Sequence, residues 1–386
     1  MVATQSSEPD LSTFTGVTLL RMVATALVDL SRHGRSPDPI YSDRVLKAYN
    51  HVVLQSLQRG LEPPASVADM ARWAATKPIG QWPFDLPEDA ENAQEFLVDR
   101  QAGVPTQLCY EWKVSGADAA AELFENEIIR SVFAQCEAAK SRPSYTAFRY
   151  LLVKRPVLTG IERATLIGEQ PALGIVLETV NRCYEQAPAA YRGTDGRFAT
   201  CARCGCLLKP HGQGWRCELD RCRREAHATP ARFIDDRETS GLYHLRAPLR
   251  IFITGPGLAE VELEDKLLKK GLVPEMWPGC DAYDLRITFP NRQVWAIDVK
   301  DRANPALLGY GATRFRPDPP YDRAFLVVPQ YRFDDRDDYK IVFEHHCPSE
   351  VIPYVTLLSD RAFMRMVSST LTRLRNAGPA TGDDNA

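Results

Sequence analysis

The chain has 386 residues, of which 44% are hydrophobic and 25% are charged, and its 47 basic and 50 acidic residues give a formal net charge of -3. These ordinary globular proportions exclude a wholly disordered, collagen-like or coiled-coil protein, and the length suggests two or three domains with their own cores. The balanced total charge does not indicate a nucleic-acid partner. It does not exclude one either, because a basic face can exist within a neutral total.

Helical spacing of apolar residues dominates the first 195 residues, where breaks that contain proline separate the helical segments. The predicted helices are 17–30, 45–57, 66–75, 117–138, 144–153 and 172–186. Residues 187–198 are rich in glycine and small polar residues, which is typical of a linker. We therefore expect a helical N-terminal domain over residues 1–195.

Two close pairs of cysteines follow this linker. Two residues separate Cys201 from Cys204, and four separate Cys217 from Cys222. Tetrahedral zinc needs four soft ligands, and two such pairs joined by a loop supply them. We predict a zinc ribbon over residues 196–232 with these four thiolates as ligands of a structural Zn²⁺. The alternative ligands in the same region are Cys206, His211 and His227.

The region of the predicted ribbon is basic. Residues 201–250 contain ten lysine or arginine residues and six acidic residues. This excess predicts a surface that contacts the phosphates of DNA, and a solvated rim is the alternative.

Short strand-like runs and helical segments alternate after residue 245, which predicts an α/β domain over residues 233–376 and a disordered tail over 377–386. The helix 258–270 ends at Gly271, and proline, asparagine and arginine join two β-rich runs into a hairpin. The expected strands are 284–289, 293–299, 324–328 and 351–358, and the expected final helix is 363–374. The last strand is expected at an edge of the sheet, because its proline cannot donate to a ladder.

Three charged side chains lie at one end of the predicted hairpin. Asp298 and Lys300 are two residues apart on one strand and therefore point the same way, and the hairpin brings Asp284 opposite them. Carboxylate oxygens suit hard cations such as Mg²⁺, and a neighbouring lysine stabilises negative charge on a phosphate. The sequence thus predicts a site for metal-dependent phosphate chemistry, and a solvated hairpin with charged ends is the alternative.

The segment 245–335 resembles the PD-(D/E)XK nuclease superfamily, in which an acidic helix precedes a hairpin with Asp and (Asp/Glu)-x-Lys, and a further helix and strand follow. The resemblance implies a restriction-endonuclease-like core with a mixed central sheet. It also implies an endonuclease that hydrolyses the phosphodiester bonds of DNA with Mg²⁺ or Mn²⁺. Tyr283 departs from the motif, because the superfamily has proline at this position.

Four residues match the functional positions of the superfamily. By resemblance, Asp284 and Asp298 are ligands of the catalytic metal, Lys300 is the catalytic lysine, and Glu260 is the acid of the helix. Two other acids compete for these roles: Glu264 is the alternative to Glu260, and Asp281 is the alternative to Asp284.

The order of a helical domain, a zinc ribbon and a nuclease core is similar to that of restriction-endonuclease-like proteins in prokaryotic defence islands that accompany PIWI-type proteins and helicases. This resemblance implies defence against foreign DNA and partner proteins of these two kinds. Restriction-like nucleases often act as dimers, so the nuclease resemblance is compatible with a homodimer. A non-catalytic zinc-ribbon DNA-binding or assembly subunit of a larger defence complex is the alternative, and cleavage of RNA is also left open.

A cytoplasmic location is expected from the chain. No apolar run is long enough to span a bilayer, and the first ten residues are polar and acidic, unlike a signal peptide. Five of the ten cysteines lie between positions 201 and 222 and the others are scattered, which is not the pattern of a secreted disulfide framework.

Overall fold

The computed structural model describes residues 16–32, 41–84, 94–100, 103–113, 119–224, 229–237 and 239–376. The chain forms two compact units, Met1–Ala119 and Ala120–Ala386, each of which is considered by itself. The domain limits predicted at residues 195, 232 and 376 stay predictions, and the tail 377–386 lies outside the described residues.

The first unit is helical, as its apolar spacing predicts. Its helix α1 has an apolar face that packs against two other helices of this unit, α2 and α4. Side-chain oxygens of Ser42 and Ser66 cap the first turns of α2 and α3 and fix where these helices begin. The elements are α1 (Gly16–Arg32), α2 (Asp43–Gln58), α3 (Val67–Thr76), η2 (Ile79–Gln81) and α4 (Gln107–Trp112).

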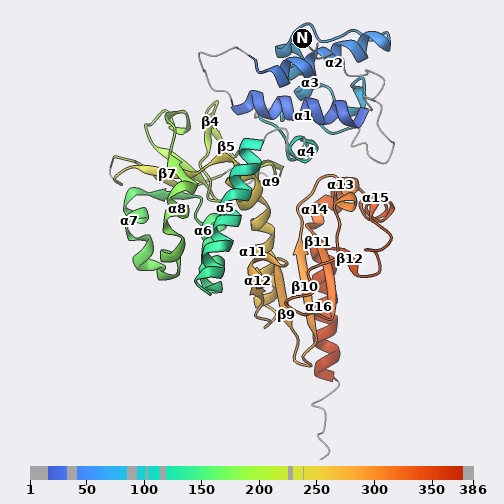
Figure 1. Ribbon diagram of the computed structural model, residues 1–386. Helices are drawn as coiled ribbons and strands as arrows, with labels where there is room; N and C mark the ends of the chain where they lie inside the picture. Colours follow the sequence, from blue (N-terminus) through green and yellow to red (C-terminus); the bar gives the residue numbers. More distant parts are fainter. Residues whose placement is uncertain are drawn as a thin grey trace, which may run out of the picture. The chain divides into compact units, whose positions relative to one another are not determined.

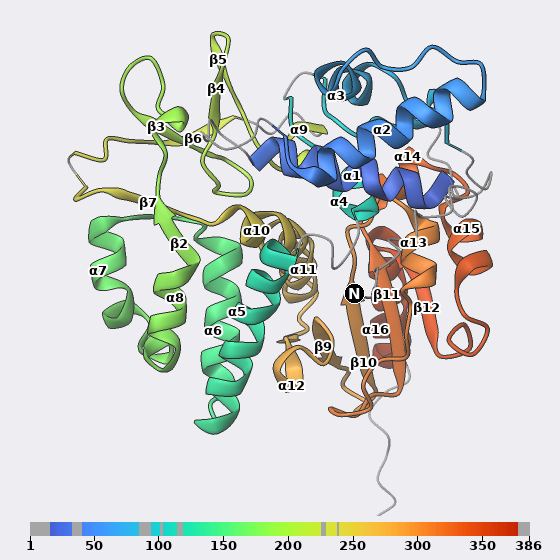
Figure 2. The ribbon, with the colours of Figure 1, turned by 45° about the horizontal axis from the view of Figure 1, so that its top comes forward.

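The second unit begins with helices and a small antiparallel sheet of order β1-β7-β2. Figures 1 and 2 both show α5 and α6 side by side. The single helix predicted over 172–186 is wrong at both ends, because it starts as a 3₁₀ turn and its last three residues pair with β7. The elements are α5 (Ala119–Ala138), α6 (Arg142–Lys154), β1 (Val157–Thr159), α7 (Gly160–Glu169), η4 (Pro171–Val176), α8 (Leu177–Cys183), β2 (Tyr184–Gln186) and β7 (Leu242–Leu245).

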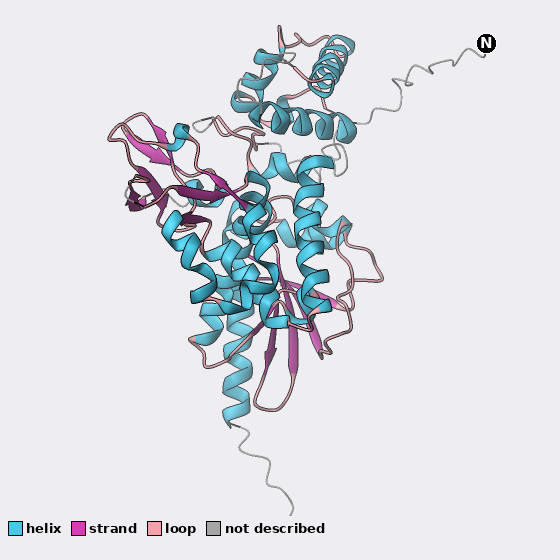
Figure 3. Cartoon of the chain, turned by 60° about the vertical axis from the view of Figure 1, so that its left-hand side comes forward, coloured by secondary structure: helices cyan, strands magenta, loops and turns pink. Residues whose placement is uncertain are grey.

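Short strands surround the cysteine pairs. β3 pairs antiparallel with β6, and β4 pairs antiparallel with β5. In Figure 3 these strands form a group separate from the larger sheet of the same unit. The elements are η5 (Ala189–Tyr191), β3 (Phe198–Cys201), β4 (Lys209–His211), β5 (Gly214–Arg216), α9 (Asp220–Arg224) and β6 (Pro230–Ile234).

The C-terminal part contains a mixed five-stranded sheet of order β12-β11-β10-β9-β8, which confirms the expected mixed α/β architecture. The pairs β8–β9 and β9–β10 are antiparallel, whereas the pairs β10–β11 and β11–β12 are parallel. Strand β12 lies at an edge, as predicted, but starts at Val355, so Pro353 stands in the turn before it. The strands are β8 (Glu275–Met276), β9 (Leu285–Thr288), β10 (Val294–Val299), β11 (Arg323–Val328) and β12 (Val355–Ser359).

Helices cover both faces of this sheet. Alternate side chains of β10, such as Trp295 and Ile297, share one apolar core with α11, α16 and α6. The opposite face packs against α13 and α15. The helices are α10 (Ala247–Leu249), η6 (Arg250–Thr254), α11 (Gly255–Leu268), α12 (Pro278–Asp281), α13 (Pro305–Tyr310), α14 (Gln330–Asp335), α15 (Tyr339–His346) and α16 (Asp360–Asn376). Among all helices of the described residues, none combines the length and the apolar character needed to cross a bilayer.

Candidate functional site

Asp284, Asp298 and Lys300 lie together where β9 begins and β10 ends. Leu285 pairs with Ile297 in the antiparallel ladder, so the next position sets Asp284 opposite Asp298. The Nζ atom of Lys300 lies 2.8 Å from Oδ1 of Asp298 and 3.6 Å from Oδ2 of Asp284. The three side chains that the sequence places at this end of the hairpin are therefore within reach of one another.

Asp284 and Lys300 differ in how far their side chains are buried. The Asp284 carboxylate is 8% exposed and accepts a 2.7 Å hydrogen bond from the backbone N–H of Val299, whereas the Lys300 side chain is 36% exposed. Burial and, after it, the nearby Glu260 carboxylate raise the pKa of Asp284 well above its usual value. Burial lowers the pKa of Lys300, but Asp284 and Asp298 outweigh it and raise this pKa. The accessible group of the cluster is thus a cation that two acids hold in its charged form.

Glu260 approaches the cluster from α11. Its carboxylate is buried and accepts a 2.5 Å hydrogen bond from Nε1 of Trp277 and a 3.2 Å one from Nη2 of Arg149. Burial raises the pKa of Glu260, and this carboxylate contributes to the pKa shifts of both Asp284 and Lys300. The alternative acid, Glu264, instead accepts a hydrogen bond from Tyr150. These contacts favour Glu260 as the acid beside the hairpin.

The segment before Asp284 is strained. Trp277, Cys280 and Asp281 have positive φ values of 47°, 54° and 73°. Such left-handed residues cost on the order of 1–3 kcal/mol each and persist only where surrounding contacts impose them. Asp281 has such contacts, since its Oδ2 accepts hydrogen bonds from Nη1 of Arg149 at 2.7 Å and the hydroxyl of Tyr145 at 2.8 Å. The competing acid is therefore bound to α6.

Arg149 was missed by the sequence reasoning. It lies on the same buried stripe of α6 as Tyr145, Phe148 and Leu152, at helical spacing. A charged residue on such a stripe requires a buried partner of opposite charge, and this is the signal that could have found it. Arg149 has two such partners, Glu260 and Asp281.

We expect Arg149→Met to destabilise the second unit by about 3–5 kcal/mol, because it leaves the buried Glu260 carboxylate without its cation. Urea unfolding followed by fluorescence measures the change. Tyr145→Phe is the matched control, since it removes one hydrogen bond from Asp281 and should cost about 1 kcal/mol. Equal losses in the two variants would contradict a dominant role for the buried ion pair.

The donor chemistry of the hairpin site fits a hard cation. Asp284 and Asp298 offer carboxylate oxygens around one ammonium, and Mg²⁺ typically takes one or two protein carboxylates and keeps several waters. Glu260 does not join Asp284 and Asp298 as a third metal ligand, because its carboxylate accepts hydrogen bonds from Arg149 and Trp277. Among the described residues, the group of three or more ligating side chains that does converge is a cysteine cluster.

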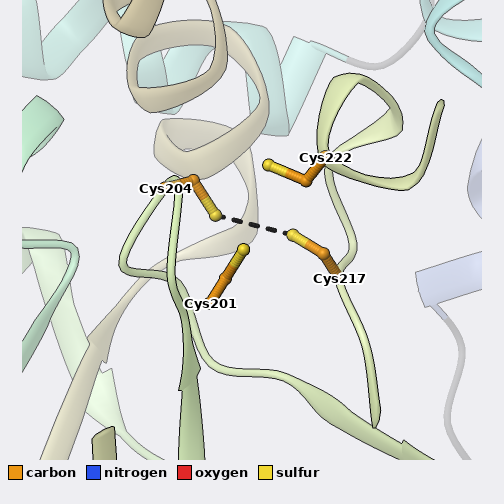
Figure 4. A group of neighbouring side chains, drawn as sticks. All are labelled: Cys201, Cys204, Cys217 and Cys222. Atoms are coloured by element: carbon orange, nitrogen blue, oxygen red, sulfur yellow. Dashed lines mark hydrogen bonds between the residues drawn. The ribbon is translucent and has the colours of Figure 1, made fainter. Parts of the chain in front are cut away.

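That cluster consists of Cys201, Cys204, Cys217 and Cys222, all of them buried. Figure 4 shows their sulfur atoms directed toward a common centre. All four Sγ atoms lie within 4.8 Å of one another, and those of Cys204 and Cys217 are 3.5 Å apart. A tetrahedral site with Zn–S bonds of about 2.3 Å sets its sulfurs roughly 3.8 Å apart. These four cysteines can therefore bind zinc.

The alternative ligands are placed differently. Cys206 is buried nearby but does not belong to the converging group, and His211 is exposed on β4. His227 lies outside the described residues. Gly205 has a φ of +70°, which turns the chain between the first pair and Cys206 and lets its N–H bond to the Cys201 carbonyl.

A charge network joins the cysteine cluster to α11. Arg203 lies between Cys201 and Cys204, Arg221 precedes Cys222, and both bind the same carboxylate, that of Glu262. The two N–O distances are 2.9 and 2.6 Å, and the arginine side chains are mostly buried. One acid of α11 therefore links the two halves of the cluster.

The network continues to the residue after Lys300. Nη1 of Arg221 lies 3.9 Å from Oδ2 of Asp301, whose Oδ1 accepts a 2.8 Å hydrogen bond from Nε of Arg332. Burial by itself raises the pKa of Asp301, but Arg332 and Arg221 outweigh burial and lower it. The backbone that carries Lys300 is thus anchored to the cysteine cluster through charges far apart in the sequence.

We expect Glu262→Gln to lower the free energy of unfolding by about 1–3 kcal/mol and to accelerate zinc loss, because it removes the negative charge that Arg203 and Arg221 share and replaces one of the two acceptor oxygens by an amide. Zinc release to a chromophoric chelator measures the second effect. Asp265→Asn changes the same charge at an exposed position of α11 and should leave zinc release unchanged. If both variants release zinc at the wild-type rate, Glu262 does not support the cluster.

Two segments of the chain match known family models. Residues 19–159 match the model described as "pPIWI_RE three-gene island domain Y", and residues 257–375 match "REase associating with pPIWI_RE", where REase stands for restriction endonuclease. Each match covers less than half of the chain. No curated protein and no solved structure matches it.

Both descriptions name pPIWI_RE, which agrees with the resemblance to restriction-endonuclease-like proteins of a PIWI-associated island. The second match contains Glu260 and the hairpin, and the first contains Arg149. The Arg149–Glu260 ion pair therefore joins the two matched segments within one compact unit. Membership of the PD-(D/E)XK superfamily and the roles of the four site residues stay predictions.

Proposed function

We propose that this chain is a metal-dependent endonuclease that hydrolyses phosphodiester bonds of DNA in prokaryotic defence against foreign DNA. The observation that carries the proposal is the cluster of Asp284, Asp298 and Lys300 at one end of the β9–β10 hairpin. The match of the surrounding residues to a restriction-endonuclease model supports it.

Each residue of the cluster has a role in this reaction. Asp284 and Asp298 would hold a Mg²⁺ or Mn²⁺ ion. When bound, such an ion supplies a water of lowered pKa and neutralises charge on the phosphate. Lys300, which has the most exposed side chain of the three, would place its ammonium where negative charge builds on the phosphate oxygens. Glu260 adds a buried negative charge beside Asp284.

The cysteine cluster has a structural role in this proposal. Cys201, Cys204, Cys217 and Cys222 would hold one Zn²⁺ with four protein ligands, which leaves no position open for a substrate. The contacts of Arg203 and Arg221 with Glu262 support a function in holding α11 beside the hairpin. Contacts of this basic ribbon with DNA phosphates belong to the same proposal.

The proposed biological partners are a PIWI-type protein and a helicase. The names of both matching models support a PIWI-type partner, because both refer to pPIWI_RE. Formation of a homodimer in the cytoplasm is part of the proposal as well.

Cleavage of supercoiled plasmid by the purified full chain tests this function. Nicking or linearisation that requires added Mg²⁺ or Mn²⁺ is the expected result, and labelled single-stranded DNA and RNA in parallel reactions define the substrate. Absence of cleavage of every substrate, also with the PIWI-type partner present, would favour the alternative of a non-catalytic DNA-binding or assembly subunit.

A further inference from the structure

A groove lined by basic side chains lies between the C-terminal end of α11 and the first turns of α16. Its volume is about 640 Å³. One of the lining residues, Asp360, is acidic and five are basic: Lys266, Lys269, Lys270, Arg361 and Arg365. The groove therefore carries four positive charges in excess of its negative charge.

Asp360, the acidic residue of the groove, is already bound by neighbouring groups of the protein. Asp360 binds Lys266 at 2.5 Å through Oδ2 and accepts hydrogen bonds from the backbone N–H groups of Gln330 and Arg361 through Oδ1. The other four cations are exposed, and none of them forms an ion pair within the described part of the chain. Their charges are thus available to a polyanion.

The groove lies at the same edge of the sheet as the hairpin cluster. Strands β10, β11 and β12 are parallel, so their carboxyl ends meet at one edge. Lys300 follows β10, Gln330 stands just after β11, and Asp360 follows β12. Since neighbouring strands are roughly 4.8 Å apart, the strand ends next to Gln330 and Asp360 lie roughly 5 and 10 Å across the sheet from the end of β10, where Lys300 stands.

We propose that this groove binds the phosphate backbone of DNA next to the hairpin cluster. The inference rests on the proposed function, which requires DNA to pass this edge of the sheet. Arginine and lysine contacts to phosphates fix the position of a duplex without reading its sequence, and two helices supply such contacts from opposite walls. An acidic protein segment would satisfy the same charges but gains nothing from lying beside a phosphate-cleaving cluster.

Binding of a fluorescent DNA duplex, measured by anisotropy, tests the groove. The protein carries Lys300→Ala and no Mg²⁺ or Mn²⁺ is added, so that no DNA is cut. Two double variants are measured. One combines Arg361→Gln with Arg365→Gln, and the other combines Lys269→Gln with Lys270→Gln. Each pair should weaken binding about tenfold and make the salt dependence of log K shallower by about 2, because the protein then neutralises two fewer phosphates.

The matched control combines Arg373→Gln and Arg375→Gln, which remove the same charge from exposed positions of the same helix beyond the groove. The control should bind DNA like the parent protein. Equal weakening in control and groove variants, no binding of DNA by the parent, or weakening confined to RNA or to an acidic peptide would each overturn the proposal.

The outcomes distinguish a failure of the groove assignment from a failure of the proposed function. If the wild type cuts DNA but the groove variants bind DNA normally, the groove assignment fails and the nuclease stands. If the groove variants lose DNA binding while the wild type cuts nothing, the groove stands and the nuclease fails.

Discussion

Lys300→Ala is expected to reduce metal-dependent DNA cleavage by roughly 100- to 1,000-fold, the effect of removing one preorganised group that stabilises transition-state charge. In the structure Lys300 has the most exposed side chain of the cluster, and its ammonium lies 2.8 Å from Asp298. In the proposed reaction, its loss removes the positive charge from the place where phosphate oxygens would gain negative charge. Single-turnover cleavage of a labelled duplex in Mg²⁺ and in Mn²⁺ measures the rate of the chemical step.

Lys340→Ala is the matched control for this prediction. Lys340 is an exposed lysine of α15 that pairs with Glu344, so the substitution removes the same group from the same sheet domain without touching the hairpin. The control should cut DNA at the wild-type rate. Zinc content and circular dichroism must be unchanged in both variants, and equal rates for Lys300→Ala and wild type would place the active site elsewhere.

Cys217→Ser is expected to lower the zinc content from about one ion per chain to near zero and to destabilise the cysteine-rich region by several kcal/mol. A structural zinc site contributes its binding free energy to folding, and one lost thiolate removes a quarter of the ligands. Mass spectrometry of the native protein measures the zinc content, and thermal unfolding measures the stability.

Cys206→Ser provides the control, because Cys206 is a buried cysteine of the same region outside the converging group. This variant should keep one zinc ion per chain. Loss of zinc in Cys206→Ser with retention in Cys217→Ser would show that the ligand set has been assigned wrongly. Chelation of zinc from the wild type should reproduce the loss of stability seen in Cys217→Ser.

Local periodicity was sufficient to predict much of this chain. The twofold alternation of a strand sets Asp298 and Lys300 on one side, and a hairpin with a short turn sets Asp284 opposite, as the ladder between β9 and β10 has it. The spacing of Cys201, Cys204, Cys217 and Cys222 indicated a four-cysteine site because each pair is close in the sequence. These features depend on interactions between near neighbours along the chain.

Contacts with residues distant in the sequence determined the features that local periodicity could not predict. The three residues after α8 continue a helical pattern, but they form β2 because β7, far along the chain, offers a ladder of hydrogen bonds. Likewise, the sequence left Glu260 and Glu264 as alternatives for the helix acid, and the contacts of Arg149 and Trp277 with Glu260 favour the first.

The sequence by itself determined the mixed α/β class of the C-terminal part, the hairpin with its acids and lysine, and the group of four cysteines. Only the tertiary structure decided that Arg149 neutralises Glu260, and that Glu262 and Asp301 connect the cysteine cluster to the strand end of Lys300. The physical reason is the range of the interactions. Periodicity indicates which face of a helix or strand a residue lies on, whereas a buried ion pair between residues 111 positions apart exists only after the chain has packed.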